Sequence, residues 1–241
     1  MKLAPPASPG PPVDKRRYVR EMFTAIAPRY DLLNHLLSLN VDRRWRRLAV
    51  DHLAWEGRPG GVYCDACAGT LDLAAELANR HGFAGRVVAA DFAPAMLRLG
   101  RSKAPGRAAG VAADTLELPF ADRTFDGATV GFGVRNLADL DAGVAELRRV
   151  LDDGGRLVIL DFTTPPWAPL RAAYLFYFRR ILPLVGGAIS GHREAYAYLP
   201  ASVEAFPPPQ ALAARMTRAG FRDCGFELLT GGIAAIHWGT R

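Results

Sequence analysis

Cysteine is scarce in this chain, and its pattern predicts neither a disulfide framework nor a metal site. There are three cysteines among 241 residues. Cys64 and Cys67 form a C-x-x-C pair, but no second pair accompanies it, and Cys64 lies inside an apolar strand-like run. The five histidines are scattered along the chain and do not cluster with the cysteines. We therefore expect no metal site and a reducing, cytoplasmic setting.

The chain also lacks an uninterrupted apolar run that could cross a membrane. Residues 1–13 are rich in proline, which predicts a disordered tail and no signal peptide. The most apolar stretch, 170–189, contains Arg179 and Arg180 near its centre and is broken by Pro183. Two central arginines cost about 5 to 7 kcal/mol on insertion, whereas the apolar side chains return roughly 3 to 5 kcal/mol. We do not expect this stretch to span a membrane.

The same stretch instead predicts an amphipathic helix. One helical face would carry Leu170, Ala173, Tyr174, Tyr177, Ile181, Leu184 and Ala188. Such a face most often packs into a core. It could equally line an apolar pocket or rest on a bilayer surface. The sequence leaves these alternatives open.

What the chain has in excess is apolar and basic residues. Half of the residues are hydrophobic and the formal net charge is +6, as expected for a globular chain with one main core. Basic residues concentrate near the N-terminus, and the segment 43–47 is the densest cluster. Such a cluster could face nucleic acid, anionic lipid or a phosphate, or could simply be a solvated helix face.

From residue 62 onward, strand-like runs alternate with helical patterns. The predicted strands are 62–66, 86–91, 110–114, 125–131 and 155–162, and the predicted helices are 71–80, 94–103 and 139–151. A turn is expected at 152–155, just before the fifth strand. Alternation at this spacing predicts a parallel sheet with helices on both faces.

The C-terminal part changes character and indicates the fold class. A helix near 208–219 is followed by two strands, 221–228 and 233–238. A closing strand pair on a doubly wound sheet predicts an α/β fold with a mostly parallel seven-stranded sheet of the S-adenosylmethionine-dependent methyltransferase type. We expect a helical cap at 14–56, the methyltransferase domain at 57–241, and a helical insertion at 163–206.

The segment from Val62 to Asp72 has the pattern of a nucleotide cradle. An apolar strand ends at Asp65, the chain turns at Gly69, and a helix follows. Helix N-termini present unpaired N–H groups to a ligand. The next strand ends on Asp91, and an acid at that place usually binds ribose hydroxyls. A βαβ unit with polar strand ends is the plainer interpretation.

Acids end three successive strands, which strengthens the prediction of a ligand site at one sheet edge. Asp114 would accept a hydrogen bond from an adenine amino group, and Met96 could pack on the base. In the usual strand order the first and fourth strands are neighbours. The Gly69 turn and the segment 131–136 would then flank one crevice.

Several blocks outside the generic cofactor fold resemble the ubiquinone/menaquinone biosynthesis C-methyltransferases. They are 26–34, 41–45, 118–120, 132–136, 196–200 and 229–233. The resemblance implies methyl transfer from S-adenosylmethionine to a ring carbon of a prenylated quinol. It puts Tyr30, Arg135 and Asn136 at positions linked to the quinol. The expected cofactor contacts are Asp65, Gly69, Thr70, Asp91, Phe92, Met96, Asp114, Thr115, Gly131 and Phe132.

Three positions depart from the pattern of that family. The family usually has glycine in place of Ala68 and Leu71, and commonly has serine in place of Gly131. If position 71 needs a positive φ, a leucine there costs about 1 to 2 kcal/mol. These departures bear on cofactor affinity more than on the fold.

The chemistry predicts a role for Arg135. A phenol with a pKa near 10 must lose its proton at pH 7, a gap of about 4 kcal/mol. Guanidinium stays charged, so Arg135 would stabilise the developing phenolate or hold a water that takes the proton. Tyr30 and Asn136 would orient that water or the ring. The alternative for Arg135 is a salt bridge to Asp139 or Asp141.

The expected partners follow from the substrate class. We expect a protein that associates peripherally with the inner face of the membrane, binds no nucleic acid and could form a homodimer. The alternative functions are an enzyme acting on another quinone or small acceptor, and a non-catalytic lipid-binding scaffold with a weakened cofactor site. A nucleic-acid methyltransferase would suit the basic N-terminus, but the chain shows no RNA-binding motif.

Overall fold

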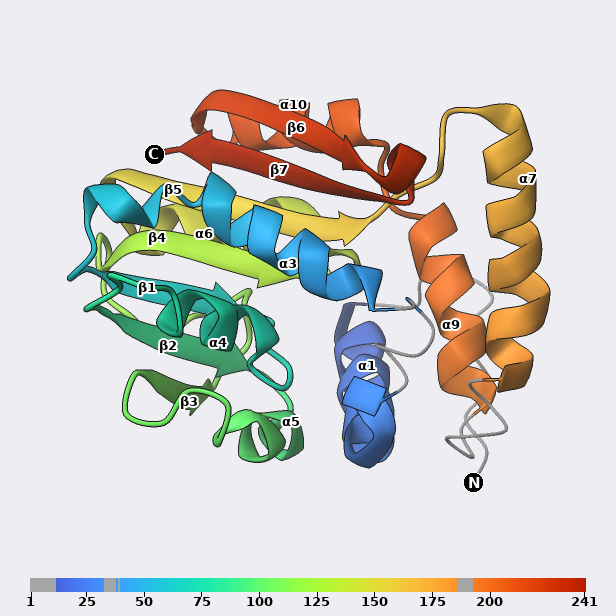
Figure 1. The fold of residues 1–241 in the computed structure, drawn as a ribbon, viewed down its shortest axis with the longest axis horizontal. Coiled ribbons are helices and arrows are strands. Elements are labelled where there is room, and N and C mark those ends of the chain that lie inside the picture. The colour runs from blue at the N-terminus through green and yellow to red at the C-terminus, as the bar shows by residue number, and fades with distance from the viewer. Residues whose placement is uncertain (1–11, 33–37, 39, 186–192) are drawn as a thin grey trace.

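The protein is built on one seven-stranded sheet, shown in Figure 1. The computed structural model describes residues 12–32, 38, 40–185 and 193–241. The strand order is β3-β2-β1-β4-β5-β7-β6, with β7 antiparallel to both of its neighbours and the remaining pairs parallel. The strands are β1 (Val62–Ala66), β2 (Arg86–Asp91), β3 (Ala108–Ala112), β4 (Phe125–Gly131), β5 (Leu151–Phe162), β6 (Arg222–Leu229) and β7 (Ala234–Thr240). The predicted fold class is confirmed.

Four strands differ from their predicted bounds, and β6 and β7 do so by only one or two residues. β3 ends at Ala112, so Asp114 lies in the following loop rather than at the strand end. β5 begins at Leu151, and the predicted turn at 152–155 interrupts it as a bulge. The register with β4 passes from Leu151 directly to Arg156. Gly154 adopts φ 76°, which glycine tolerates without a steric penalty.

Helices cover both faces of the sheet and enclose two hydrophobic cores. They include α3 (Val41–His52), α4 (Asp72–Ala78), α5 (Pro94–Gly100), α6 (Leu140–Val150) and α10 (Pro209–Arg218). One core packs α3 and α4 on the sheet, and the other packs α6 and α10 on its opposite face. Asp139 caps α6 by accepting a hydrogen bond from the N–H of Ala142 at 3.0 Å.

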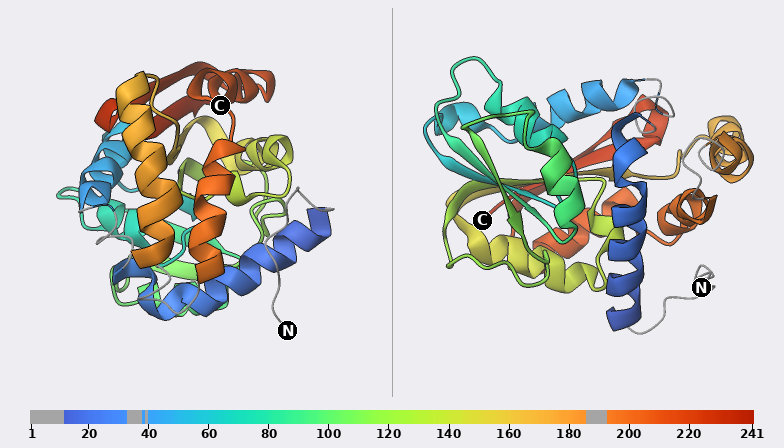
Figure 2. Two further views of the ribbon diagram at one scale, coloured as in Figure 1. Left: turned by 90° about the vertical axis from the view of Figure 1, so that its right-hand side faces the viewer. Right: turned by 90° about the horizontal axis from the view of Figure 1, so that it is seen from below.

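A helical cover lies beside the ligand edge of the sheet (Figure 2). It consists of α1 (Pro12–Ile26), the short helix η1 (Ala27–Arg29), α7 (Ala168–Phe176), a π-helical turn (Tyr177–Ile181) and α9 (Arg193–Glu204). A small third core joins these helices through Ile26, Tyr174, Phe178, Leu182 and Val203. α1 begins at Pro12, so residues 12 and 13 belong to this helix and not to the predicted tail.

The predicted apolar face of the 170–189 helix is only partly right. Tyr174, Phe178 and Leu182 are the buried positions, whereas Ile181 and Leu184 are exposed. Ala188 lies outside the described residues. The π-helical turn widens the helix to i→i+5 bonding, so residues four apart stay aligned on the inner face. Within the described residues, no helix is both long and apolar enough to cross a membrane.

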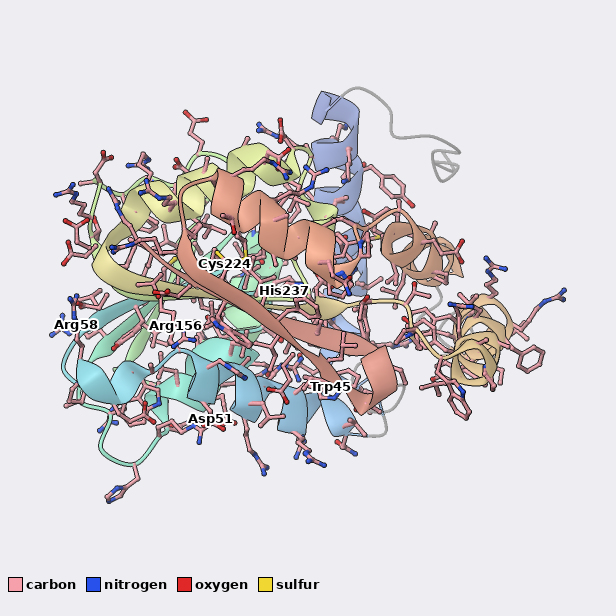
Figure 3. The ribbon with its side chains drawn as sticks, turned by 90° about the horizontal axis from the view of Figure 1, so that it is seen from above. Trp45, Asp51, Arg58, Arg156, Cys224 and His237 are labelled. Atoms are coloured by element: carbon pink, nitrogen blue, oxygen red, sulfur yellow. The ribbon has the colours of Figure 1, made fainter. Side chains whose placement is uncertain are left out.

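α3 is tied to the far end of the chain. The indole N–H of Trp45 donates to the hydroxyl of Thr230 at 2.9 Å, in the turn between β6 and β7. Figure 3 shows Trp45 beside this turn. The neighbouring Arg46 is 7% exposed and forms ion pairs with Asp42 and Asp72. Arg43, Arg44 and Arg47 are exposed. The basic cluster is therefore an amphipathic helix with its tryptophan turned inward.

Candidate active site

The carboxyl ends of β1 and β2 form a polar turn around Gly69. Gly69 adopts φ 53°, and its N–H donates to one carboxylate oxygen of Asp91 at 2.8 Å. The other oxygen of Asp91 accepts the N–H of Ala93 at 2.8 Å. Burial raises the pKa of Asp91, although these two hydrogen bonds oppose the shift. An ionised carboxylate has about four acceptor positions, so acceptor capacity remains for a ligand diol.

Asp65 lies at the same edge but has a different environment. It is 1% exposed and accepts hydrogen bonds from the N–H of Ala74 at 3.0 Å and the hydroxyl of Thr129 at 2.9 Å. Burial raises the pKa of Asp65 to about 7. The carboxylate thus ties β1 to β4 and to the first turn of α4, while the residue also borders a small cavity beside Gly69.

Asp114 and Thr115 lie across the crevice from Gly69. Asp114 accepts the N–H of Leu116 at 2.9 Å and faces Arg16 of α1 at 3.4 Å. Thr115 is buried, and its hydroxyl contacts the Cys67 sulfur at 3.3 Å. The predicted adenine acceptor is therefore paired with α1, whose Arg16 borders the same small cavity.

Two small cavities surround the Gly69 turn. One, of about 50 Å³, is bordered by the predicted cofactor residues Gly69, Asp91, Phe92, Met96, Asp114, Thr115, Gly131 and Phe132. The other, of about 30 Å³, is bordered by Asp65, Gly69, Thr70, Gly131 and Phe132. The structure therefore brings all ten predicted cofactor residues together. These volumes hold only a few waters each.

Leu71 does adopt the left-handed backbone conformation, with φ 65° and ψ 26°. Its side chain is 1% exposed and belongs to the core on the α3 and α4 side. It borders none of the three described cavities. Gly131 is explained by a neighbour, because a Cβ there would meet Cδ1 of Leu73 at 2.6 Å. Leu71 does not block the turn.

A chain of charges fastens the N-terminal cover to the turn. The Thr70 hydroxyl donates to Asp31 at 2.5 Å. Lys103 pairs with Asp31 at 2.7 Å and with Asp72 at 2.5 Å. Asp72 also faces Arg46 at 3.2 Å. Thr70, expected to contact the cofactor, borders one of the small cavities and also bonds to Asp31, which follows η1 of the cover.

The largest of the described cavities is apolar and lies between the sheet edge and the helical cover. Its volume is about 410 Å³. Its lining comes from α1, α3, α7, α9 and the ends of β4 and β5, and includes Met22, Phe23, Ile26, Trp45, Phe132, Arg135, Phe162, Tyr174, Phe178, Leu182 and Tyr198. Tyr30 and Phe132 border this cavity and both small ones. They mark the place where the polar and apolar regions meet.

Arg135 is the basic residue on the wall of this cavity nearest the end of β4. Its guanidinium donates to a carboxylate oxygen of Asp161 at 2.6 Å and to the carbonyl of Phe132 at 2.5 Å. The two side chains are 7% and 1% exposed. Burial raises the pKa of Asp161, and the adjacent Arg135 opposes that shift. Arg135 does form a salt bridge, but not to Asp139 or Asp141.

The side chains of Asn136 and Arg135 border different cavities, although the two residues are adjacent in the chain. Asn136 borders the small cofactor-side cavity, whereas Arg135 borders the large apolar one. Its side-chain oxygen accepts the Tyr198 hydroxyl at 3.2 Å, and its amide donates to the carbonyl of Phe132 at 3.3 Å. Lys15 of α1 donates to the Leu137 carbonyl at 2.6 Å. Residues 136 and 137 are thus bonded to α9 through Tyr198 and to α1 through Lys15.

Three residues of this region were not predicted from the sequence as site residues. Asp161 continues the pattern of acids at strand ends, because it lies near the end of β5, so that signal was available. Tyr198 lies inside the block 196–200. Tyr174 is 5% exposed and its hydroxyl has no hydrogen-bond partner among the described residues. Helical periodicity had put it on the face that could line an apolar pocket, but did not distinguish it from the other residues of that face.

Comparison with solved structures defines the class of protein. A methyltransferase–activator complex from Haloferax volcanii contains a chain that matches with a TM-score of 0.65 and 14% identity, covering 90% of this chain and 96% of that one. A methyltransferase from Thermotoga maritima matches with a TM-score of 0.62 and 16% identity, covering 91% and 98%. The fold, with its glycine turn and strand-end acids, is that of the S-adenosylmethionine-dependent methyltransferases.

Sequence comparison narrows the class to a family. Residues 12–241 match the ubiE/COQ5 methyltransferase family, and the chain belongs to it. A demethylmenaquinone methyltransferase from Thermus thermophilus is 54% identical, covering 91% of this chain and all of the relative. A ubiquinone/menaquinone biosynthesis C-methyltransferase from Citrifermentans bemidjiense is 45% identical, covering 95% and 98%. The chain is an S-adenosylmethionine-dependent C-methyltransferase.

Proposed function

We propose that the protein methylates a ring carbon of a prenylated quinol, as the names of its relatives suggest. One observation supports this most. An apolar cavity of about 410 Å³ bordered by Arg135 meets the acid-rich glycine turn at Tyr30 and Phe132. An aromatic ring at this junction would have the methyl donor on one side and room for an apolar tail on the other.

The residues around Gly69 fit S-adenosylmethionine. Asp91 would accept the ribose hydroxyls, Asp114 the adenine amino group, and Met96 and Phe92 would pack against the base. Gly69, Thr70, Thr115 and Gly131 would border the rest of the molecule, and Asp65 would hold the turn in shape. When bound, the cofactor supplies an electrophilic methyl group. We propose that α1 and the rest of the segment 14–56 act as a cap that opens for it.

Arg135 would stabilise the quinol oxygen as it becomes a phenolate. A positive group in a water-poor apolar cavity is worth far more than the same group in water. Asp161 is a positioning residue, because it fixes the guanidinium and balances its charge without bordering the cavity. The ring loses one proton overall, and a water held by Arg135 would carry it away.

Tyr30 and Asn136 would orient the ring from the cofactor side. Both border the cavity next to Gly69, and Asn136 is fixed by Tyr198. The aromatic cluster of Trp45, Phe132 and Phe162 would pack against the ring, with Phe132 and Phe162 centroids 4.8 Å apart. An isoprenoid tail would gain about 0.8 kcal/mol per buried CH₂ from the cavity wall.

The cellular setting follows from the substrate. We propose peripheral association with the inner face of the cytoplasmic membrane, where a prenylated quinol resides, and no nucleic-acid partner. We also propose that the protein can form a homodimer in this setting.

The test is the mass of the product. Incubation with S-adenosylmethionine and a short-tailed demethylquinol should yield a product heavier by one CH₂, with the methyl on a ring carbon. A different mass change would indicate another reaction, and methylation of only a non-quinol acceptor would indicate another substrate. Titration calorimetry with S-adenosylmethionine separates an enzyme from a non-catalytic scaffold, because a scaffold with a weakened cofactor site would bind the cofactor only weakly.

A further inference from the structure

The helix that walls the apolar cavity carries apolar residues on its outer side as well. Tyr174, Phe178 and Leu182 face inward and border the cavity. On the outer side, Phe176 is 63% exposed and Leu184 is 59% exposed, with Ile181 beside them. Trp167, 66% exposed, precedes the helix. A surface helix with apolar residues on its outer face as well as its inner face usually contacts a membrane or another protein.

The charge of this segment points to the nature of the partner. Residues 163–185 contain three arginines and no acidic residue. Arg180 is exposed on the outer stripe between Phe176 and Leu184, because residues four apart share a face. Arg171 and Arg179 are exposed as well, and Arg179 pairs with Glu204 at 2.8 Å. Aromatic and aliphatic side chains mixed with arginine are typical of helices that lie in an anionic lipid interface.

The position of the helix supports the same partner. α7 is the outermost element on its side of the molecule in the views of Figures 1 and 2. We infer that the outer face of the helical segment 168–185 docks on an anionic bilayer. This face is formed by Phe176 of α7, Arg180 and Ile181 of the π-helical turn, and Leu184 just after it. This inference rests on the proposed function, and it adds which surface meets the lipid. The cavity would then lie one helix thickness from the acyl chains that hold the substrate.

Vesicle flotation tests the docking face. The full-length protein should float with vesicles of about equal phosphatidylglycerol and phosphatidylcholine at low salt, and much less with phosphatidylcholine alone. The double variant Phe176→Ser/Leu184→Ser should bind anionic vesicles about tenfold or more weakly. Arg180→Glu should weaken binding at least about fivefold, from the contribution of one basic residue.

The chain offers a matched control. Leu99 on α5 and Val62 at the start of β1 are 48% and 37% exposed, and both elements lie away from α7 in Figure 1. Leu99→Ser/Val62→Ser should bind vesicles like the unaltered protein. Equal binding by the α7 variant and the unaltered protein would overturn the inference. So would a lack of binding by the unaltered protein, or an α7 variant that only turns a dimer into a monomer.

A second measurement separates this inference from the proposed function. Phe176 and Leu184 do not border the cavity, so the α7 variant should methylate a short-tailed quinol in solution at the usual rate. Its rate on a long-tailed quinol embedded in anionic vesicles should fall about tenfold. Failure of the unaltered protein to methylate the short-tailed quinol would overturn the proposed function, whereas the flotation result would still decide the docking face.

Discussion

The cofactor edge and the apolar cavity are neighbours built on different principles. Around Gly69, charged groups are tied to backbone or to one another, as Asp91 is to Gly69 and Ala93. At the wall of the apolar cavity, Arg135 pairs with Asp161 beside the ring of Phe162, and the hydroxyl of Tyr174 has no partner among the described residues. Hydrogen bonds to backbone fix the geometry of the polar turn, whereas apolar surroundings strengthen the electrostatic interactions of the few charged groups beside them. The two regions should therefore respond differently to substitution.

The largest expected effect is on Arg135. Arg135→Lys should lower turnover on a short-tailed demethylquinol at least about tenfold, because lysine cannot reproduce the fixed fork that Asp161 orients. Calorimetry should show S-adenosylmethionine binding unchanged. Arg215→Lys, which changes an exposed pair with Asp141, is the matched control. Unchanged turnover in Arg135→Lys would contradict the role of Arg135 in stabilising the phenolate, and with it the contrast between the apolar cavity and the cofactor edge.

A substitution at the cofactor edge should have the opposite pattern, with a loss of affinity rather than of turnover. Asp91→Asn should weaken S-adenosylmethionine binding about 10- to 100-fold, because it removes a charged acceptor of about 1.5 to 3 kcal/mol. Turnover at saturating cofactor should change much less. Asp122→Asn, at an exposed acid paired with Arg149, should leave affinity as it is. Equal affinities for the two variants would contradict the role of Asp91.

Leu71 tests whether backbone strain or core packing dominates at the turn. Leu71→Gly should relieve about 1 to 2 kcal/mol of strain but lose about 2 to 5 kcal/mol of buried contact. We expect a lower free energy of unfolding, by about 2 kcal/mol, measured by urea titration. Ala54→Gly, at an exposed site with φ 55°, should instead be stabilising by up to about 1 kcal/mol. A stabilising Leu71→Gly would show that strain dominates.

The smallest expected effect concerns the unpartnered hydroxyl in the apolar cavity. Tyr174→Phe should leave the free energy of unfolding unchanged or raise it by up to about 1 kcal/mol, because no hydrogen bond is lost. Tyr198→Phe should lower it by about 1 kcal/mol, since the Tyr198 hydroxyl donates to Asn136. Thermal unfolding of both variants compares them directly. A larger loss for Tyr174→Phe than for Tyr198→Phe would indicate an additional bond to Tyr174.

Much of the sheet was predictable from local pattern. The predicted bounds of β1, β2 and β4 agree with the structure, because buried parallel strands read as short apolar runs. The helix at 170–189 was harder to predict. An ideal 3.6-residue period assigns Ile181 and Leu184 to the inner face, but the π-helical turn shifts the phase. Such a turn depends on how the helix packs against its neighbours.

The site divides in the same way. Local pattern alone indicated Asp65, Gly69 and Asp91, because strand ends and glycine turns follow from short-range chemistry. The family resemblance indicated Arg135, but its partner Asp161 is 26 residues away. The alternative of a salt bridge from Arg135 to Asp139 or Asp141 was wrong, because tertiary packing brings Asp161 to the guanidinium instead.

The sequence by itself determined the sheet, its class and the polar edge where a methyl donor would bind, since these arise from periodicity, turns and strand-end acids. Tertiary structure alone decided that Arg135 pairs with Asp161, that Leu71 turns into the core, and that α7 is apolar on two sides. Those outcomes depend on which distant segments occupy the same volume, and no local pattern encodes that.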